Sequence, residues 1–239
     1  MRIAVVSTPR SGNHWIKCLL GEAYELRTLA GRDKPDRNNA RGVRRWVDDG
    51  RFADGTILHQ HARYRRRLAD AFEAVPARIV TIVRDPYDAF VSLYHWAQVR
   101  GAEPGRSDQP RARDVLVDRP IDDPVVHRYL AGDRFADFIE RGLSWVESGR
   151  SVVVRYEELH VDPLGALRAL TDEIEPVPDE KLVRAIDHCS VTNMRATTRP
   201  GRVRAGRVGD GAVELGPEHL ALIREHHADR IRRLGYEVR

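Results

Sequence analysis

Cysteine, lysine and long hydrophobic runs are scarce in this sequence. Its 239 residues include only two cysteines, Cys18 and Cys189, which are far apart and belong to no CxxC pair. Such cysteines predict a reducing compartment and no structural zinc site. The apolar run at residues 3–6 is too short for a signal-peptide core or a membrane-spanning helix. We therefore expect a cytoplasmic protein without a membrane anchor.

Because lysine occurs only at positions 17, 34 and 181, arginine supplies nearly all of the positive charge. The formal net charge of +4 permits anionic ligands, but the arginines are spread along the whole chain and do not single out nucleic acid. Hydrophobic residues make up 41% of the chain and charged residues 32%, a balance typical of a globular domain and not of a disordered chain.

Short apolar runs alternate along the chain with segments of helical periodicity. The runs are typical of buried parallel strands and lie at residues 3–7, 56–61, 78–83 and 151–155. Helical periodicity follows several of them, as at 12–22 and 87–99. The alternation predicts an α/β fold, in which helices flank a central parallel β-sheet, and a single domain over residues 1–239.

The first predicted strand runs into Pro-Arg-Ser-Gly at the point where a helix begins. A helix N-terminus presents unpaired N–H groups that attract phosphate, and Arg10 adds a forked cation suited to oxyanions. Gly12 allows close approach of a ligand, and the flanking side chains can donate hydrogen bonds: Ser11, Asn13 and His14. The alternative is an ordinary strand-to-helix connection with a serine cap. Neither G-x-x-x-x-G-K-[ST] nor G-x-G-x-x-G is present, which disfavours kinase and dinucleotide-binding interpretations.

Two segments together resemble the cytosolic-type sulfotransferase family. STPRSGNHW at 7–15 is similar to the family's 5′-phosphosulfate loop, PKSGTTW, and IVRDPYDAFVSLYHW at 82–96 is similar to its 3′-phosphate motif, RNPKDxxVSxYH. The resemblance implies a P-loop-like phosphosulfate loop and the transfer of a sulfuryl group from 3′-phosphoadenosine 5′-phosphosulfate (PAPS) to a hydroxyl or amine. Adenosine 3′,5′-bisphosphate (PAP) is the product, and no metal is expected.

Further matches extend the resemblance toward the C-terminus. VVVRYEELHVDP at 152–163 is similar to the family's strand ending in YEDL, which implies that Tyr156 contacts adenine. Trp15 stands where the family's tryptophan lies against the purine. HCSVTNM at 188–194 matches a segment near adenine and the 3′-phosphate, with Ser190 as the candidate. Without the resemblance, Trp15 at the start of an apolar helix is better interpreted as a core residue, and Tyr156 is likewise interpretable as a core tyrosine whose hydroxyl bonds the backbone.

The 3′-phosphate is expected to bind Arg84 and Ser92, with a further contribution from RAGRVGDG at 204–211. That segment resembles RKGxxGDW, and its candidate binding residues are Arg204, Ala205 and Gly206. Gly211 stands where the family commonly has tryptophan. The alternative for Arg84 is a surface ion pair with an aspartate of its own motif, Asp85 or Asp88.

The candidate general base lies in GTILHQHAR at 55–63, where the family has a K-x-H pattern. The match places His61 at the catalytic histidine and His59 at the lysine. Imidazole titrates near neutrality and suits proton removal from an acceptor. A pair of histidines two apart on a strand is also compatible with a metal site, and His14 is a rival base. Arg10, in place of the usual lysine, and Ser92 complete the expected catalytic set.

The acceptor is expected to be a small molecule and not nucleic acid or a membrane. Segments 27–55 and 97–135 have no recognisable counterpart in the family and are the expected acceptor-pocket or lid inserts. Their many arginines favour a polar or acidic acceptor, such as a glycoside or another secondary metabolite. The family's dimer motif KxxxTVxxxE is not visible. The alternatives are a small-molecule kinase with an atypical P-loop and a non-catalytic nucleotide-binding or nucleic-acid-binding module.

Overall fold

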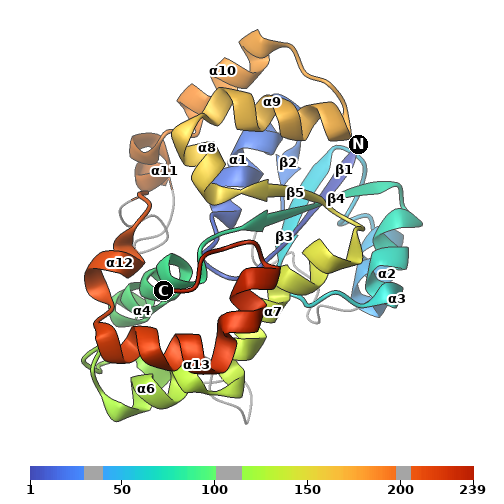
Figure 1. Cartoon of the computed structure of the whole chain (residues 1–239). Coiled ribbons are helices and arrows are strands. Elements are labelled where there is room, and N and C mark those ends of the chain that lie inside the picture. The colour runs from blue at the N-terminus through green and yellow to red at the C-terminus, as the bar shows by residue number, and fades with distance from the viewer. Residues whose placement is uncertain (30–39, 101–114, 198–205) are drawn as a thin grey trace.

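Five parallel strands form the centre of the molecule. In the computed structural model, which describes residues 1–29, 40–100, 115–197 and 206–239, they are arranged in the order β2-β3-β1-β4-β5 (Figure 1). The predicted α/β fold with a parallel sheet is confirmed. The strands are β1 (Arg2–Val6), β2 (Arg27–Thr28), β3 (Thr56–Gln60), β4 (Ala77–Val83) and β5 (Val152–Arg155).

Helices precede, follow and connect these strands. Three of them begin at an aspartate followed by proline. The Asp85 carboxylate accepts a hydrogen bond from the Tyr87 N–H at 2.8 Å, Asp123 accepts one from the Val125 N–H at 2.7 Å, and Asp162 accepts one from the Gly165 N–H at 2.9 Å. The helices are α1 (Asn13–Ala23), α2 (Ala40–Asp48), α3 (Arg66–Glu73), α4 (Pro86–Arg100), α6 (Pro124–Ala131), α7 (Asp133–Ser148), α8 (Tyr156–Val161), α9 (Pro163–Ile174), α10 (Asp179–His188), α11 (Val191–Thr197), α12 (Asp210–Glu214) and α13 (Pro217–Arg233).

Side-chain alternation in β1 explains why helices cover both faces of the sheet. Ile3 and Val5 belong to the hydrophobic cluster that contains residues of α1, α9 and α10. Ala4 and Val6 point to the opposite face and pack with α2, α3 and Trp145 of α7. In Figure 1, α9 and α10 accordingly lie on one side of the strands, and α2 and α3 lie on the other.

A third hydrophobic cluster lies beyond the carboxyl ends of the strands. It is formed by residues of α4, α6, α7 and α13, and α6 packs against α13 (Figure 1). Phe135 is fully buried in it, in edge contact with Phe90 at a centroid distance of 5.7 Å. This helical layer leaves space between itself and the sheet edge, and the candidate site occupies that space. None of the described helices combines the length and hydrophobicity that a membrane span requires.

Candidate functional site

A cavity of about 700 Å³ opens where β1 and β4 end. The register pairs Val5 of β1 with Val80 of β4, so the loops that follow both strands emerge at the same edge of the sheet. Most of the residues singled out from the sequence line this cavity: Arg10, Gly12, Asn13, His14, Trp15, His61, Arg84, Ser92, Tyr156 and Gly206. Motifs up to 196 residues apart in the chain are thus brought together.

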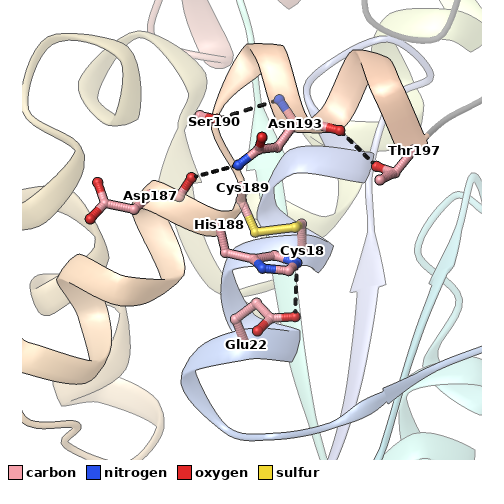
Figure 2. Close-up of a disulfide and its surroundings, with 8 residues drawn as sticks. All are labelled: Cys18, Glu22, Asp187, His188, Cys189, Ser190, Asn193 and Thr197. Atoms are coloured by element: carbon pink, nitrogen blue, oxygen red, sulfur yellow. Dashed lines mark hydrogen bonds and ion pairs between the residues drawn. A yellow bond between two sulfur atoms is a disulfide. The ribbon is translucent and has the colours of Figure 1, made fainter.

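Five of the predicted site residues are not placed in the cavity wall. Ser11 and His59 are buried behind it, and the Ser190 hydroxyl accepts a hydrogen bond from the Asn193 N–H at 3.4 Å, as a cap of α11 (Figure 2). Arg204 and Ala205 lie outside the described residues. The described structure therefore gives Ser190 a capping role, while its proposed ligand contact stays a prediction.

Backbone conformation shapes the turn between β1 and α1. Gly12 caps α1 at φ 96°, a left-handed conformation that side-chain-bearing residues rarely adopt. A Cβ atom at this position would lie 2.7 Å from Cδ2 of Tyr156. Arg10 also has a positive φ, 68°, although it is not glycine. Such conformations persist where the surrounding structure fixes them, commonly at binding sites.

The Asn13 side chain holds this turn together. Its Nδ2 donates a hydrogen bond to the Thr8 carbonyl at 2.9 Å, and its Oδ1 accepts one from the Ser7 hydroxyl. Both ends of the amide are thereby used inside the loop. The sequence had suggested that the Asn13 side chain could donate to a phosphate. Because Asn13 also lines the cavity, its proposed contact with the phosphate stays a prediction beside this role in the loop.

Arg10 reaches from this turn to the second motif. Its Nε donates a hydrogen bond to the Ser92 hydroxyl at 3.1 Å. The guanidinium also lies over the Trp96 ring, 5.9 Å from its centroid. Ser92 and Trp96 are one turn apart on α4, so one face of that helix orients the Arg10 cation toward the cavity.

Arg84 is a buried cation at the cavity wall, with 8% of its surface exposed. Its Nη1 donates a hydrogen bond to the Arg10 carbonyl at 3.2 Å, and its Nη2 donates one to the Arg207 carbonyl at 2.9 Å. The guanidinium carbon lies 4.4 Å from the Tyr156 ring centroid. Nε is buried without a hydrogen-bond partner among the described residues. A buried guanidinium with an unused N–H is suited to an oxyanion.

The aspartates of the same motif are mainly engaged elsewhere. Arg84 Nη2 lies 3.8 Å from Asp88 Oδ2, at the limit of an ion pair. Both Asp88 oxygens accept stronger bonds, each 2.7 Å long, from the N–H groups of Gly209 and Gly211. Asp85 pairs at 2.7 Å with Arg239. The alternative of a simple surface ion pair therefore does not describe Arg84, which is buried and only partly neutralised.

The replacement of the family's tryptophan by Gly211 has a packing reason. A Cβ atom at Gly211 would lie 2.6 Å from Cβ of Tyr87 and 2.9 Å from the backbone nitrogen of Asp88. The start of α12 thus packs directly on the start of α4. Only glycine permits this approach, which lets Asp88 hold the segment that contains Arg207 beside the cavity.

Aromatic rings form a slot at the end of the cavity nearest α8 and α11. The rings of Trp15 and Tyr156 meet edge to face at a centroid distance of 5.7 Å, and His160 stacks nearly parallel to Tyr156 at 6.2 Å. Burial raises the pKa of the Tyr156 hydroxyl, although the neighbouring Arg84 opposes this effect.

Sequence reasoning had omitted His160 and several other lining residues. His160 follows Tyr156 by four positions, so helical spacing could have placed it on the same face. The others lie in the two segments that resemble family motifs, 188–194 and 204–211, but were not singled out within them: Cys189, Val191, Met194, Arg207 and Asp210.

The three predicted histidines lie in a chain of ring contacts. The His59 ring is 5.5 Å from that of His61 and 4.9 Å from that of His14. His61 lines the cavity, and its Nδ1 lies 3.1 Å from the carbonyl oxygen of Ser7. A carbonyl only accepts, so Nδ1 carries the proton and Nε2 has the lone pair. His59, by contrast, is only 5% exposed and does not line the cavity.

The metal-site interpretation of His59 and His61 has no support in the described residues, because neither belongs to a cluster of three close metal-ligating side chains. Such a cluster occurs near α6 and α13, in Asp122, His127 and His219. There, His219 Nδ1 accepts a hydrogen bond from the Gly216 N–H at 3.2 Å, and Nε2 lies 3.1 Å from the Ile121 carbonyl. Nε2 therefore carries the proton, and hydrogen bonding accounts for the arrangement.

Positive charge dominates the cavity wall. Its described residues include five arginines but only two aspartates: Arg10, Arg84, Arg134, Arg141, Arg207, Asp137 and Asp210. Arg207 Nε pairs with Asp210, and Arg141 pairs with Asp137. The excess of guanidinium groups inside a partly enclosed space favours a ligand with several negative charges.

A disulfide joins Cys18 of α1 to Cys189 at the end of α10 (Figure 2). The two Cα atoms are 5.9 Å apart, although 171 residues separate them in sequence. The prediction of a reducing compartment assumed that the two cysteines are unpaired, and this assumption is wrong. Sequence distance concealed the packing of α1 against α10. The bond ties the helix of the first turn to the residue before Ser190 and α11.

The two unmatched inserts contribute unequally to the cavity. Tyr129 of α6 lines it, together with Arg134, both within 97–135. No described residue of 27–55 does so; Val43, Trp46 and Phe52 instead pack in the core beside α3. Residues 30–39 and 101–114, which complete these inserts, lie outside the described residues.

The chain matches a family model described as "Sulfotransferase domain" over residues 1–205. It is 25% identical to Cytosolic sulfotransferase 3 of Arabidopsis thaliana, covering 90% of this chain and 72% of the relative. It is 24% identical to Sulfotransferase 2B1 of Mus musculus, covering 82% and 56%.

Two solved structures share the fold. Mouse sulfotransferase SULT7A1 complexed with PAP superposes with a TM-score of 0.72 at 19% identity, covering 97% of this chain and 84% of the other. Retinol dehydratase in a complex with retinol and PAP superposes with a TM-score of 0.61 at 14% identity, covering 100% and 82%.

Proposed function

The chain belongs to the sulfotransferase domain family, and we propose that it transfers a sulfuryl group from PAPS to a hydroxyl or amine of a small-molecule acceptor. One observation carries the proposal: the residues of both phosphate motifs line a single cavity of about 700 Å³ and are bonded to one another. Two solved structures of this fold are complexes with PAP, which is consistent with such a donor.

The 5′-phosphosulfate end fits the turn before α1. Gly12 lets the backbone approach a ligand at the start of α1, where the helix N-terminus favours an anion. Arg10 adds a cation that Ser92 orients. As charge develops on the leaving phosphate oxygen, these groups would stabilise it without rearrangement, which is the usual source of catalysis in group transfer.

The 3′-phosphate end fits the buried guanidinium of Arg84, whose Nε–H is unused among the described residues. Gly206 lies in the same wall, and Ser92 adds a hydroxyl group. Adenine fits the slot between Trp15, Tyr156 and His160, where stacking of a base on aromatic rings is worth about 1–3 kcal/mol. When bound, PAPS supplies the activated sulfuryl group. The residues named above would bind and orient it and stabilise the charge that develops on the leaving phosphate.

His61 is the proposed general base. With Nδ1–H donated to the Ser7 carbonyl, Nε2 is the ring nitrogen that would accept the proton of an acceptor hydroxyl in the cavity. His59 contacts the His61 ring from a buried position and is better suited to orienting it than to touching the acceptor. His14 lines the same cavity and remains the rival base.

Thermal stabilisation by nucleotides tests the donor assignment. PAP should raise the melting temperature more than AMP, ADP or ATP, because the others lack the 3′-phosphate that Arg84 would bind. An equal response to all four, or a preference for ATP, would overturn the proposal and favour the kinase alternative. Transfer of labelled sulfate from PAPS to a panel of small phenols, alcohols and amines then tests the reaction itself.

A further inference from the structure

The wall of the cavity opposite the aromatic slot combines apolar and charged side chains. It is formed by residues of α4, α6 and α7, which lie in the lower part of Figure 1, whereas α8 and α11 lie above them. We call this wall the acceptor lobe and define it by six residues: Trp96, Tyr129, Arg134, Asp137, Phe138 and Arg141. Its rings offer a surface for a flat apolar body, and Arg10 connects it to the proposed phosphosulfate end through Trp96.

Tyr129 brings an unsatisfied polar group to this lobe. The residue is only 3% exposed, and its ring stacks on Phe90 at a centroid distance of 5.9 Å. Its hydroxyl makes no hydrogen bond to the rest of the described chain. Burial raises the pKa of this hydroxyl, so it stays a neutral donor and acceptor. A hydroxyl at the cavity wall that no described residue bonds is placed to bond a ligand atom.

The charges beside Tyr129 do not balance. Asp137 is shared by two arginines, because its carboxylate lies 2.7 Å from Arg63 Nε and 2.7 Å from Arg141 Nη2. Arg134 lines the cavity without an ion pair or hydrogen bond to any described residue. Two guanidinium groups therefore share the Asp137 carboxylate, and Arg134, on the same helix, adds a third cation without an ion pair to any described residue.

We propose that the acceptor has a flat apolar body bearing an acidic group, a carboxylate, sulfate or phosphate, which Arg134 and Arg141 bind while Tyr129 donates to it. This inference rests on the proposed function and specifies its acceptor. The apolar rings alone would accept a neutral alcohol such as retinol, the compound named with one structural neighbour. The two arginines and the Tyr129 hydroxyl at this wall would favour an acceptor with an anionic group over a neutral alcohol.

A matched pair of fluorescent probes tests the proposal. 8-Anilinonaphthalene-1-sulfonate and N-phenyl-1-naphthylamine share one aromatic body, and only the first has an anionic group. With the protein saturated with PAP, we expect the sulfonate to bind about ten-fold more tightly or better. Arg134→Ala and Arg141→Ala should each lower that preference several-fold and leave the neutral probe unchanged. Arg128→Ala, an exposed arginine of α6 outside the cavity wall, is the matched control.

Asp137→Asn gives a test of opposite sign, because removal of the one carboxylate should tighten sulfonate binding. Equal affinity for the two probes, or a preference that survives both arginine substitutions, would overturn the inference. These outcomes are separable from failure of the proposed function. A protein that PAP stabilises but that shows no anionic preference keeps its donor assignment and loses only the acceptor class, whereas one that PAP does not stabilise loses the donor assignment itself.

Discussion

Arg10 donates a hydrogen bond from Nε to the hydroxyl of Ser92 across 3.1 Å, which joins two motifs 82 residues apart. A second bond, 3.2 Å long, runs from Arg84 to the Arg10 carbonyl. The two phosphate motifs are therefore one bonded unit, and not merely neighbours around a cavity. A ligand with a phosphate at each end would contact both motifs at once. A substitution in one motif should therefore also alter how the other motif binds the ligand.

Arg84→Gln should lower the affinity for PAP by about ten- to a hundred-fold, because it removes a charge-assisted donor to the 3′-phosphate. The affinity for ADP, which lacks that phosphate, should change much less. Isothermal titration of both ligands measures the difference. Arg78→Gln, at the exposed position of the same strand, is the control and should leave both affinities unchanged. An equal loss for PAP and ADP would assign Arg84 a purely structural role.

His61→Gln should lower the rate of sulfate transfer by about 10²- to 10⁴-fold while leaving PAP affinity nearly intact, since a positioned base contributes that much. Single-turnover transfer from PAPS, measured with any acceptor found in the panel, gives the rate. His14→Gln should have the smaller effect on rate, and the exposed His188→Gln should have none. If His14→Gln lowers the rate more than His61→Gln does, His14 and not His61 is the general base.

Reduction of the Cys18–Cys189 disulfide should lower the free energy of unfolding by about 2–5 kcal/mol, because the bond closes a very long loop in the unfolded chain. PAP affinity should fall as well, since Cys189 lines the cavity and directly precedes the segment that leads into α11. Urea unfolding with and without dithiothreitol measures the first effect. The Cys18→Ser/Cys189→Ser variant should have the same free energy of unfolding as the reduced protein, and dithiothreitol should not change it. Thiol titration of the unreduced, denatured protein that found two free cysteines would contradict the pairing.

Stability should decline as the pH falls below about 6.5, in part through His227. This side chain is 3% exposed and bonds the Leu130 carbonyl at 2.7 Å. Burial lowers its pKa below the usual 6.5, with Arg230 adding to the effect. Below pH 6.5 the unfolded chain therefore binds a proton at this histidine that the folded protein does not bind. The free energy of unfolding is unaffected above the pKa of the unfolded state, and it falls as the pH drops toward the lower pKa of the folded state. His227→Gln should flatten this dependence in urea titrations, and His188→Gln should not.

Local pattern predicted the strands and helices that carry the main motifs. The apolar run at 3–7 and the helical spacing at 12–22 correspond closely to β1 and α1. Elements with little local signal were missed: β2 has two residues, and α8 has six. Strand β2 forms because the end of α1 and the sheet edge bring its backbone beside β3, and no side-chain pattern encodes such pairing.

Within the candidate site, sequence reasoning identified the residues on the two phosphate motifs because each motif follows a strand directly. It did not single out His160 or Arg207, although both lie in segments that resemble family motifs. It also did not single out the side chains of the acceptor lobe, which come from helices that the third hydrophobic cluster positions. Asn13, predicted to contact the ligand, also bonds Ser7 and Thr8 within the folded loop.

The sequence by itself determined the order of strands and helices, the family and the two phosphate motifs, because these depend on periodicity and on short contiguous segments. Only the tertiary structure decided that Cys18 meets Cys189, that Arg84 is buried beside Tyr156, and that Arg63 and Arg141 share Asp137. Such relationships depend on how helices pack across the sheet, and packing is set by contacts among residues far apart in the chain.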